Sequence, residues 1–135
     1  MYDVALSFTR QTDGSDEQTI TVTAASTNYL DFGSDGNFFE PAYLHIRVLD
    51  AFESATSGAT LTVALQSDDN TSFSSAATML TPVSAVDHSS LTAGYHVVVP
   101  FPIQDLEQYY RLYFTASATM TTGSIVAYIN DSPEL

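Results

Sequence analysis

The chain contains no cysteine, no tryptophan and no lysine, and its basic residues are limited to Arg10, Arg47 and Arg111. Without cysteine there is no disulfide framework and no thiolate for catalysis or zinc binding, so packing and strand pairing must stabilise the fold. Sixteen acids against three bases give a net charge of -13. Because phosphate groups require clustered Lys or Arg, this charge argues against nucleic acid and anionic membranes as partners.

Long hydrophobic runs are also missing. The first ten residues, MYDVALSFTR, lack the basic start and the unbroken apolar run of a secretory signal. No apolar run is long enough to span a membrane. We therefore expect no export signal, synthesis in a cytoplasm, and a single domain over residues 1–135 with a core of its own.

Short segments with alternating apolar and polar residues are what the chain has in abundance. In SGATLTVALQS, Leu61, Val63 and Leu65 alternate with polar or small residues, which is typical of a strand with one buried face. Similar segments recur between clusters of Gly, Ser, Asp, Asn or Pro. The expected strands are Val4–Thr9, Thr19–Thr23, Asn28–Phe32, Tyr43–Asp50, Ala59–Gln66, Ala76–Leu80, Tyr95–Val99, Tyr109–Ala116 and Ser124–Asn130.

The connecting segments are expected to be turns and loops. Thr81–Thr92 is polar and predicts an irregular stretch, and Ile103–Gln108 is the one helix candidate, a single turn. Eight or nine short strands in one domain favour an all-β, two-sheet antiparallel sandwich of the jelly-roll type. An immunoglobulin-like sandwich is the rival fold, and the absence of a cysteine pair and of tryptophan counts against it.

Several segments, in this order, carry a resemblance to a known family: ITVTAASTNYLDFG, EPAYLHIRVLDAF with SGATLTVALQSDDNTSFSSA, SLTAGYHVVVPFP, and EQYYRLYFTASATMTTGSIVAYI. Together they resemble the small jelly-roll cement proteins, also called decoration proteins, of tailed bacteriophage capsids. The resemblance covers most of the chain and lies in strands, turns and linkers. It implies a non-enzymatic protein of the virion, made in the host bacterial cytoplasm, that binds the outer surface of the assembled head. It also implies a homo-oligomer, dimer or trimer, that holds neighbouring major capsid protein subunits together.

Aromatic and basic residues supply candidate contacts. On the strand that ends at Ala116, the outward residues Tyr109, Arg111 and Tyr113 combine residue types that are enriched at interface hot spots. These three, together with Arg47, are expected to form an oligomer interface; the alternative for the tyrosines is a cross-strand aromatic ladder. Arg47 and Arg111 are each expected to pair with an acid, in this chain or in a partner. The residues of the same strand expected to face the core are Tyr110, Leu112 and Phe114.

Two further segments are expected to contact the capsid. The adjacent Phe38 and Phe39 are either folded under their loop or presented to a partner, and exposed adjacent phenylalanines usually indicate binding. The N-terminal residues Tyr2, Asp3 and Val4 form either an edge strand or an arm that reaches a neighbour.

Titratable residues give no catalytic or metal signature. His45, His88 and His96 show neither HxH nor HxxxH spacing, so we expect exposed or interfacial side chains and not a metal or catalytic pair. The acidic loops either organise turns or converge on a calcium ion, and none has the twelve-residue spacing of an EF-hand. These loops are Asp13–Glu17, Asp31–Asp35 and Asp68–Asp69.

The sequence thus predicts no catalytic residue, no cofactor and no resident metal. The alternative function is a carbohydrate-binding or receptor-binding β-sandwich module of a virion, because jelly rolls present sugars to aromatic platforms and calcium loops. The absence of tryptophan weakens that alternative.

Overall fold

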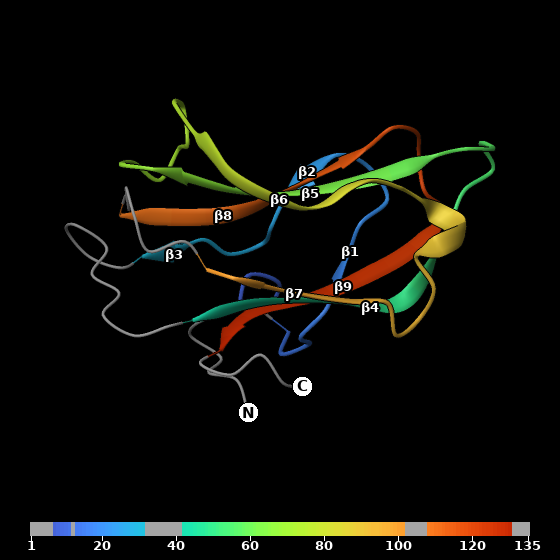
Figure 1. Cartoon of the computed structure of the whole chain (residues 1–135), viewed down its shortest axis with the longest axis horizontal. Coiled ribbons are helices and arrows are strands. Elements are labelled where there is room, and N and C mark those ends of the chain that lie inside the picture. The colour runs from blue at the N-terminus through green and yellow to red at the C-terminus, as the bar shows by residue number, and fades with distance from the viewer. Residues whose placement is uncertain (1–6, 12, 32–41, 102–107, 131–135) are drawn as a thin grey trace.

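The computed structural model describes residues 7–11, 13–31, 42–101 and 108–130. Within these residues nine strands form two antiparallel sheets that pack face to face (Figure 1). The strands are β1 (Gln18–Thr19), β2 (Ala24–Ala25), β3 (Leu30–Asp31), β4 (Tyr43–Glu53), β5 (Thr60–Asp68), β6 (Ala77–Asp87), β7 (His96–Pro100), β8 (Tyr109–Ala116) and β9 (Thr122–Asn130), and the 3-10 helix η2 (His88–Ser90) follows β6.

The strand order is that of a hairpin rolled up on itself. Sheet A has the order β1-β9-β4-β7, and sheet B has the order β2-β8-β5-β6. Strand β3 pairs with the opposite end of β8 from β2, so that β2 and β3 together occupy one strand position. The strand pairs are therefore nested, as a jelly roll requires: β1 pairs with β9, β2 and β3 with β8, β4 with β7, and β5 with β6. The predicted all-β jelly-roll sandwich is confirmed.

A single core fills the space between the sheets. It is built from the inward row of each strand, because alternate side chains along a strand point to opposite faces. Burying each large apolar side chain contributes roughly 1.5–3 kcal/mol relative to leaving it exposed. The buried set includes the expected inward residues Leu44, Ile46, Val48, Leu61, Val63, Leu65, Tyr110, Leu112 and Phe114, together with Ile125, Ala127 and Ile129.

The N-terminal strand expected over Val4–Thr9 is described from Ser7 onward. Ser7 forms an isolated bridge with Tyr128, and the Phe8 N–H donates to the Ala127 carbonyl at 2.9 Å. The Phe8 side chain is buried in the core. This segment therefore extends the edge of sheet A beside β9, and the rest of the expected strand lies outside the described residues.

The prediction of a strand over Thr19–Thr23 is wrong beyond its first residue. The chain leaves sheet A after β1 and enters sheet B at β2, so the four intervening residues cross between the sheets. Ile20 enters the core while Val22 is exposed, although strict alternation would place both side chains on the same face. The Thr23 hydroxyl accepts from the Ala116 N–H at 3.0 Å, which ties the crossing to the end of β8.

The irregular stretch expected over Thr81–Thr92 is also wrong, because β6 continues to Asp87 and η2 follows it. The pairing of β6 with β5 contains three register shifts, so the residues Leu80, Val83 and Val86 that pair with inward residues recur every third position. Because of this spacing, the strand lacks the alternation of apolar and polar residues by which strands are predicted from sequence. Ala85 has a positive φ of 47°, as expected where a bulge bends an edge strand.

The remaining expectations differ little from the structure. Strand β8 has the expected bounds, β4, β5 and β9 are slightly longer than expected, and β3 and β7 are within a few residues of their predicted positions. The helical turn expected from Ile103 lies outside the described residues, apart from Gln108. No helix in the described part of the chain is long and apolar enough to cross a membrane.

Gly123 is a position where the fold requires glycine. Its φ is +143°, and a Cβ added there would lie 2.3 Å from Cδ2 of the buried Phe52 ring. Because Phe52 of β4 packs directly on the backbone of β9, any side chain at position 123 would push the two strands apart.

We therefore expect Gly123→Ala to lower the free energy of unfolding by about 2–4 kcal/mol, from overpacking plus the strain of a positive φ. Gly94→Ala is the matched control, because Gly94 has a φ of +96° with no atom within 4 Å of an added Cβ. It should cost about 1 kcal/mol through backbone strain alone. Denaturant unfolding measures both values, and equal losses would mean that the Phe52 contact does not limit the site.

Candidate functional site

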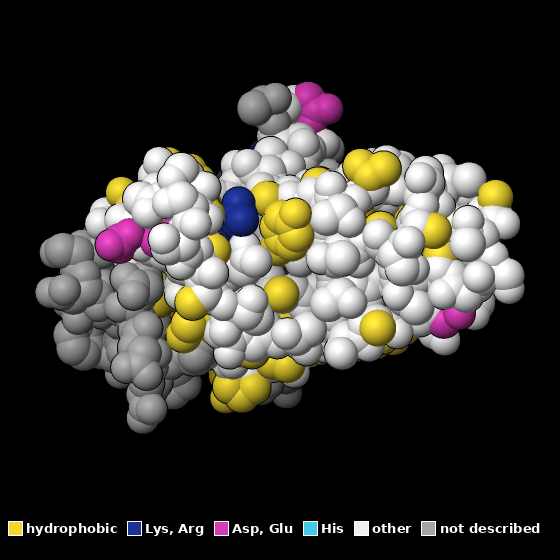
Figure 2. Space-filling view, turned by 90° about the horizontal axis from the view of Figure 1, so that it is seen from above, with side chains coloured by type: hydrophobic (Ala, Val, Ile, Leu, Met, Phe, Trp, Pro, Cys, Tyr) yellow, Lys and Arg dark blue, Asp and Glu magenta, His cyan; other side chains and the backbone are white. Residues whose placement is uncertain are grey.

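The outer face of sheet B carries almost no charge. Asp31 and Asp68 lie at one end of this face and Asp87 at the other; between them, the described outward residues of β5 and β8 and the exposed residues of β6 include no acid. We call this surface the acid-free face. Its residues are Thr62, Ala64, Gln66, Thr78, Thr81, Ser84, Ala85, Arg111, Tyr113 and Thr115. Figure 2 looks onto it: the centre is white and yellow, and magenta appears toward the margins.

Arg111 is the cation of this face, and its guanidinium is held on several sides. Its Nε–H donates to Oε1 of Gln66 at 2.8 Å, and Gln66 is its partner in the β5–β8 register. The guanidinium carbon lies 4.5 Å from the centre of the Phe73 ring and 5.2 Å from that of Tyr113. Such cation–π contacts hold a planar guanidinium in a defined orientation. In Figure 2 a dark blue patch is bordered by yellow side chains.

Aromatic rings extend the acid-free face at one end. Tyr29, which is 48% exposed, makes edge-to-face contacts with Tyr109 and Phe73, at ring centroid distances of 5.5 and 6.3 Å. Such pairs add roughly 0.5–1.5 kcal/mol beyond their buried area. Through Phe73, these rings connect to the group that contacts Arg111.

The outer face of sheet A is built differently, around a stack of three rings. The His45 ring lies parallel to that of Tyr128, with centroids 4.9 Å apart, and stacks on that of His96 at 5.7 Å. The register explains this stack, because β9, β4 and β7 are neighbours and place these side chains on one face. His45 is fully buried, so the expectation that it is exposed or interfacial is wrong.

His96 is the titratable residue of this stack whose protonation is clearly disfavoured. Burial, followed by the nearby charges of His45 and Arg47, lowers the pKa of His96 below the ordinary value of 6.5. Its Nε2 is buried and finds no hydrogen-bond partner in the described part of the chain. The neutral imidazole is therefore the form that the folded protein favours.

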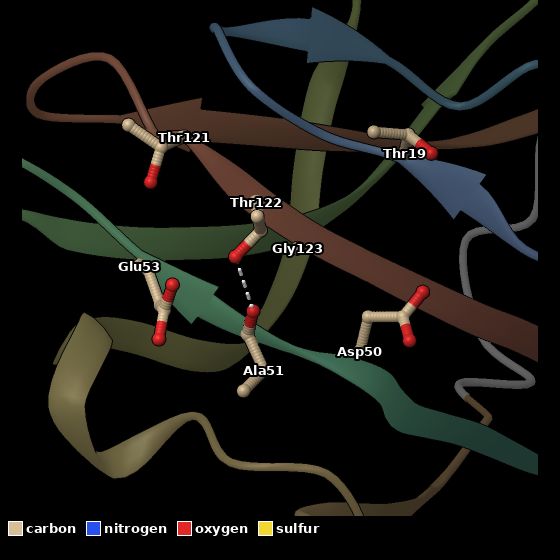
Figure 3. Close-up of a pocket in the computed structure, with 7 residues that line it drawn as sticks. All are labelled: Thr19, Asp50, Ala51, Glu53, Thr121, Thr122 and Gly123. Atoms are coloured by element: carbon tan, nitrogen blue, oxygen red, sulfur yellow. Dashed lines mark hydrogen bonds between the residues drawn. The ribbon is translucent and has the colours of Figure 1, made fainter.

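A hollow of about 460 Å³ opens on sheet A where β1, β4 and β9 meet (Figure 3). Two carboxylates, those of Asp50 and Glu53, line it, but in the figure they lie at opposite ends and do not converge. Ser124 Oγ donates to Asp50 Oδ2 at 2.9 Å, and Thr122 Oγ1 donates to the Ala51 carbonyl at 2.9 Å. Both hydroxyls thus join β9 to the irregular end of β4, and the hollow shows no paired acid and base for catalysis.

Two of the three acidic loops organise their own turns, and the third, Asp31–Asp35, lies outside the described residues apart from Asp31. Asp13 Oδ1 accepts from the Ser15 N–H and hydroxyl at 3.0 and 2.7 Å, and these bonds lower the pKa of Asp13. Asp68 is buried and accepts from the Ser75 N–H at 2.8 Å and the Asp69 N–H at 2.7 Å. Within the described ranges no group of three or more His, Cys, Asp or Glu side chains could hold a metal ion.

Comparison with known protein families adds one match. The model of the Bbp16 family matches residues 14–129, which include eight of the strands in full and all but the last residue of β9. The chain belongs to the Bbp16 family. None of the curated proteins compared with the chain matches it. The acid-free face lies wholly within the Bbp16 match.

The predicted oligomer residues fall on two surfaces of this Bbp16-family chain. Tyr109, Arg111 and Tyr113 lie together on the outside of sheet B, half-buried, as their alternation predicts. Arg47 projects from β4 on sheet A, where it lines a hollow of about 280 Å³ with Asp16 and other residues. The structure therefore does not bring Arg47 together with the other three.

The expected acid partners of Arg47 and Arg111 are not found in the described residues. The ion pair there joins Arg10 to Asp16, with a distance of 2.8 Å between Nη1 and Oδ1. Arg111 instead contacts an amide and two rings, because the register places Gln66 opposite it. No sequence signal identifies these partners, because Gln66 is an ordinary outward strand residue and Phe73 lies in a segment predicted as a turn.

The predicted capsid contacts cannot be placed on either surface. Tyr2, Asp3, Val4, Phe38 and Phe39 lie outside the described residues. They remain predictions from the sequence.

The histidine stack predicts how stability depends on pH. Because the pKa of His96 is lower in the folded chain than in the unfolded chain, the unfolded state takes up its proton first as the pH falls. The free energy of unfolding should therefore decrease as the pH falls below 6.5, and this contribution should be absent above that pH. His96→Phe keeps a stacking ring without a titrating group, so it should lose less stability than the wild type between about pH 7.5 and about pH 5.5 in denaturant titrations.

Val98→Ala is the control for general weakening, because Val98 lies on the same face of β7. It should lower stability by similar amounts at both pH values. An unchanged pH dependence in His96→Phe would contradict the assignment to His96.

Proposed function

We propose that this chain is a capsid cement protein: it binds the outer surface of the assembled head of a tailed bacteriophage and stabilises contacts between major capsid protein subunits. It acts as a binding protein and not as an enzyme, and it functions as a homo-oligomer, dimer or trimer. It is made in the host bacterial cytoplasm and resides on the outside of the virion. Its partner is the protein shell, without nucleic acid, membrane or cofactor.

The acid-free face is the observation that carries this proposal. A molecule with a net charge of -13 is repelled by most acidic protein surfaces, and a side without acids is where another protein approaches at least electrostatic cost. The small and hydroxyl side chains of this face permit close approach. Tyrosine and arginine, which are enriched among interface hot spots, lie within it.

The sequence resemblance and the fold point the same way. The segments that resemble phage decoration proteins contain β5, β8 and all but the last residue of β4 and of β9, which build the centres of both sheets. A jelly roll is a rigid platform that presents strand faces and loops, and it supports many unrelated functions. The argument for function therefore depends on the surface and not on the fold alone.

The mechanism is thermodynamic. A ligand that binds the assembled, expanded lattice better than the unassembled subunits stabilises the lattice by mass action. Each copy needs to contribute little, because many copies act on one shell and an oligomer can engage several sites at once. Rigidity helps, because a preformed surface loses little conformational entropy when it binds.

Cosedimentation with phage heads tests the proposal. We expect the purified chain to pellet with expanded heads that lack it, and to saturate at a number of copies that matches the symmetry of the lattice. Heads already carrying the wild-type chain are the control, and they should bind no more. Saturated heads should also withstand higher temperature before they release DNA.

Failure to pellet with heads of its own phage would overturn the proposal. Binding to a glycan array, or a melting temperature that rises with calcium, would instead favour the carbohydrate-binding or receptor-binding module. The two functions are distinguished by which ligand saturates the protein.

A further inference from the structure

Within the described residues, Arg111 is a charged group held in place without a counter-charge. Its Nε–H is bonded to Gln66, and its plane is covered by Phe73 and Tyr113. Phe73 is only 7% exposed, so the ring that supports the guanidinium is itself held by the protein. A guanidinium with so few alternative positions loses little conformational entropy when it binds a ligand.

Nothing in the described residues neutralises this charge. The Arg111 side chain takes part in no ion pair there, although the chain carries sixteen acids. Two acids lie two residues away in the register, because Asp31 of β3 and Asp68 of β5 both pair with Tyr109. Asp31 accepts from Nε2 of Gln108 at 3.1 Å and makes no ion pair with Arg111.

Asp68 is the buried acid of the two. Its two carboxylate oxygens already accept from the N–H groups of Ser75 and Asp69. Asp68 therefore stabilises the turn that follows β5 and is not a counter-charge for Arg111.

The terminal guanidinium nitrogens of Arg111 are the donors that remain. No described residue accepts a hydrogen bond from them, and one edge of the guanidinium fork matches the two oxygens of a carboxylate. Around this group the acid-free face offers Ala64, Thr62 and Thr115, which are small enough for a partner backbone to approach. The local chemistry is that of a receptor for one acidic side chain set among uncharged residues.

We propose that Arg111 binds a carboxylate side chain of the major capsid protein, and that the acid-free face is the side of this chain that lies on the shell. This inference rests on the proposed function and names the surface that performs it. It replaces the role in an oligomer interface that the sequence predicts for Tyr109, Arg111 and Tyr113.

A second copy of the chain fits this face less well. In a two-fold contact the same patch meets itself, so the centre of the acid-free face would meet another centre without an acid. Arg111 would then face a second arginine or uncharged side chains. Two copies also carry -13 each, so their association gains nothing from charge.

The experiment measures the affinity of purified variants for expanded heads that lack the protein. Arg111→Gln removes the charge and should weaken binding at least about tenfold, as expected when one partner of a desolvated charge pair is removed. Arg10→Gln is the matched control, because it makes the same change in net charge away from the face and should bind within about twofold of the wild type. Wild-type affinity should fall with added salt, and Arg111→Gln should show a smaller fall.

A second pair of variants keeps the test valid if Arg111→Gln folds poorly. Ala64→Asp places an acid on the acid-free face beside β8 and should weaken binding at least as much, whereas Ser57→Asp adds the same charge in the exposed turn before β5 and should not. Melting curves establish that each variant is folded. Light scattering of each variant without heads gives its oligomeric state.

The outcomes separate the two proposals. If the wild type does not bind heads, the proposed function fails and this inference fails with it. If the wild type binds and Arg111→Gln and Ala64→Asp bind equally well, only the assignment of the face is overturned. If either variant dissociates an oligomer in the absence of heads, the ligand of Arg111 is a second copy and the inference is wrong.

Discussion

The rest of this structure depends on the core that the two sheets share. Each strand buries one row of its side chains in this core. With no disulfide available, strand pairing and this core must supply the stability. Leu44, Ile46 and Val48 of sheet A are buried as completely as Leu61 and Val63 of sheet B, so neither sheet can lose its partner. The side chains that point outward do not contribute to this core, so their residue types can serve function.

How much the sequence predicts follows from how strictly each strand alternates. Strand β8 lies in the middle of sheet B, alternates without a break and has the predicted bounds Tyr109–Ala116. Strand β6 lies at the edge and contains bulges, so its inward residues recur every third position and the pattern conceals it. The crossing after Thr19 fails for a related reason, because a chain that changes sheets changes the face to which each residue points.

The residues of the candidate site were predicted only in part, because their partners are set by strand register. The scarcity of bases draws attention to Arg111, and alternation places it outside the core. Its partners come from elsewhere: Gln66 is 45 residues away in sequence and is opposite only because β5 pairs with β8 in one register. His45 shows the same limit, because the rings on which it stacks come from the two neighbouring strands.

The two outer faces differ in charge, and this difference bears on orientation under the proposed function. On the solvent side of sheet A, acids line the two hollows described above, Asp50 and Glu53 in one and Asp16 and Glu17 in the other. The described residues at the centre of sheet B include no acid. A chain that laid sheet A on a protein surface would have to desolvate several carboxylates, which is costly unless each finds a partner. A chain that binds a protein surface through sheet B keeps the carboxylates of sheet A in water, where they maintain solubility and repel other particles. The distribution of acids therefore favours one orientation even before Arg111 is considered, and the carboxylate binding proposed for Arg111 would then define the position within it.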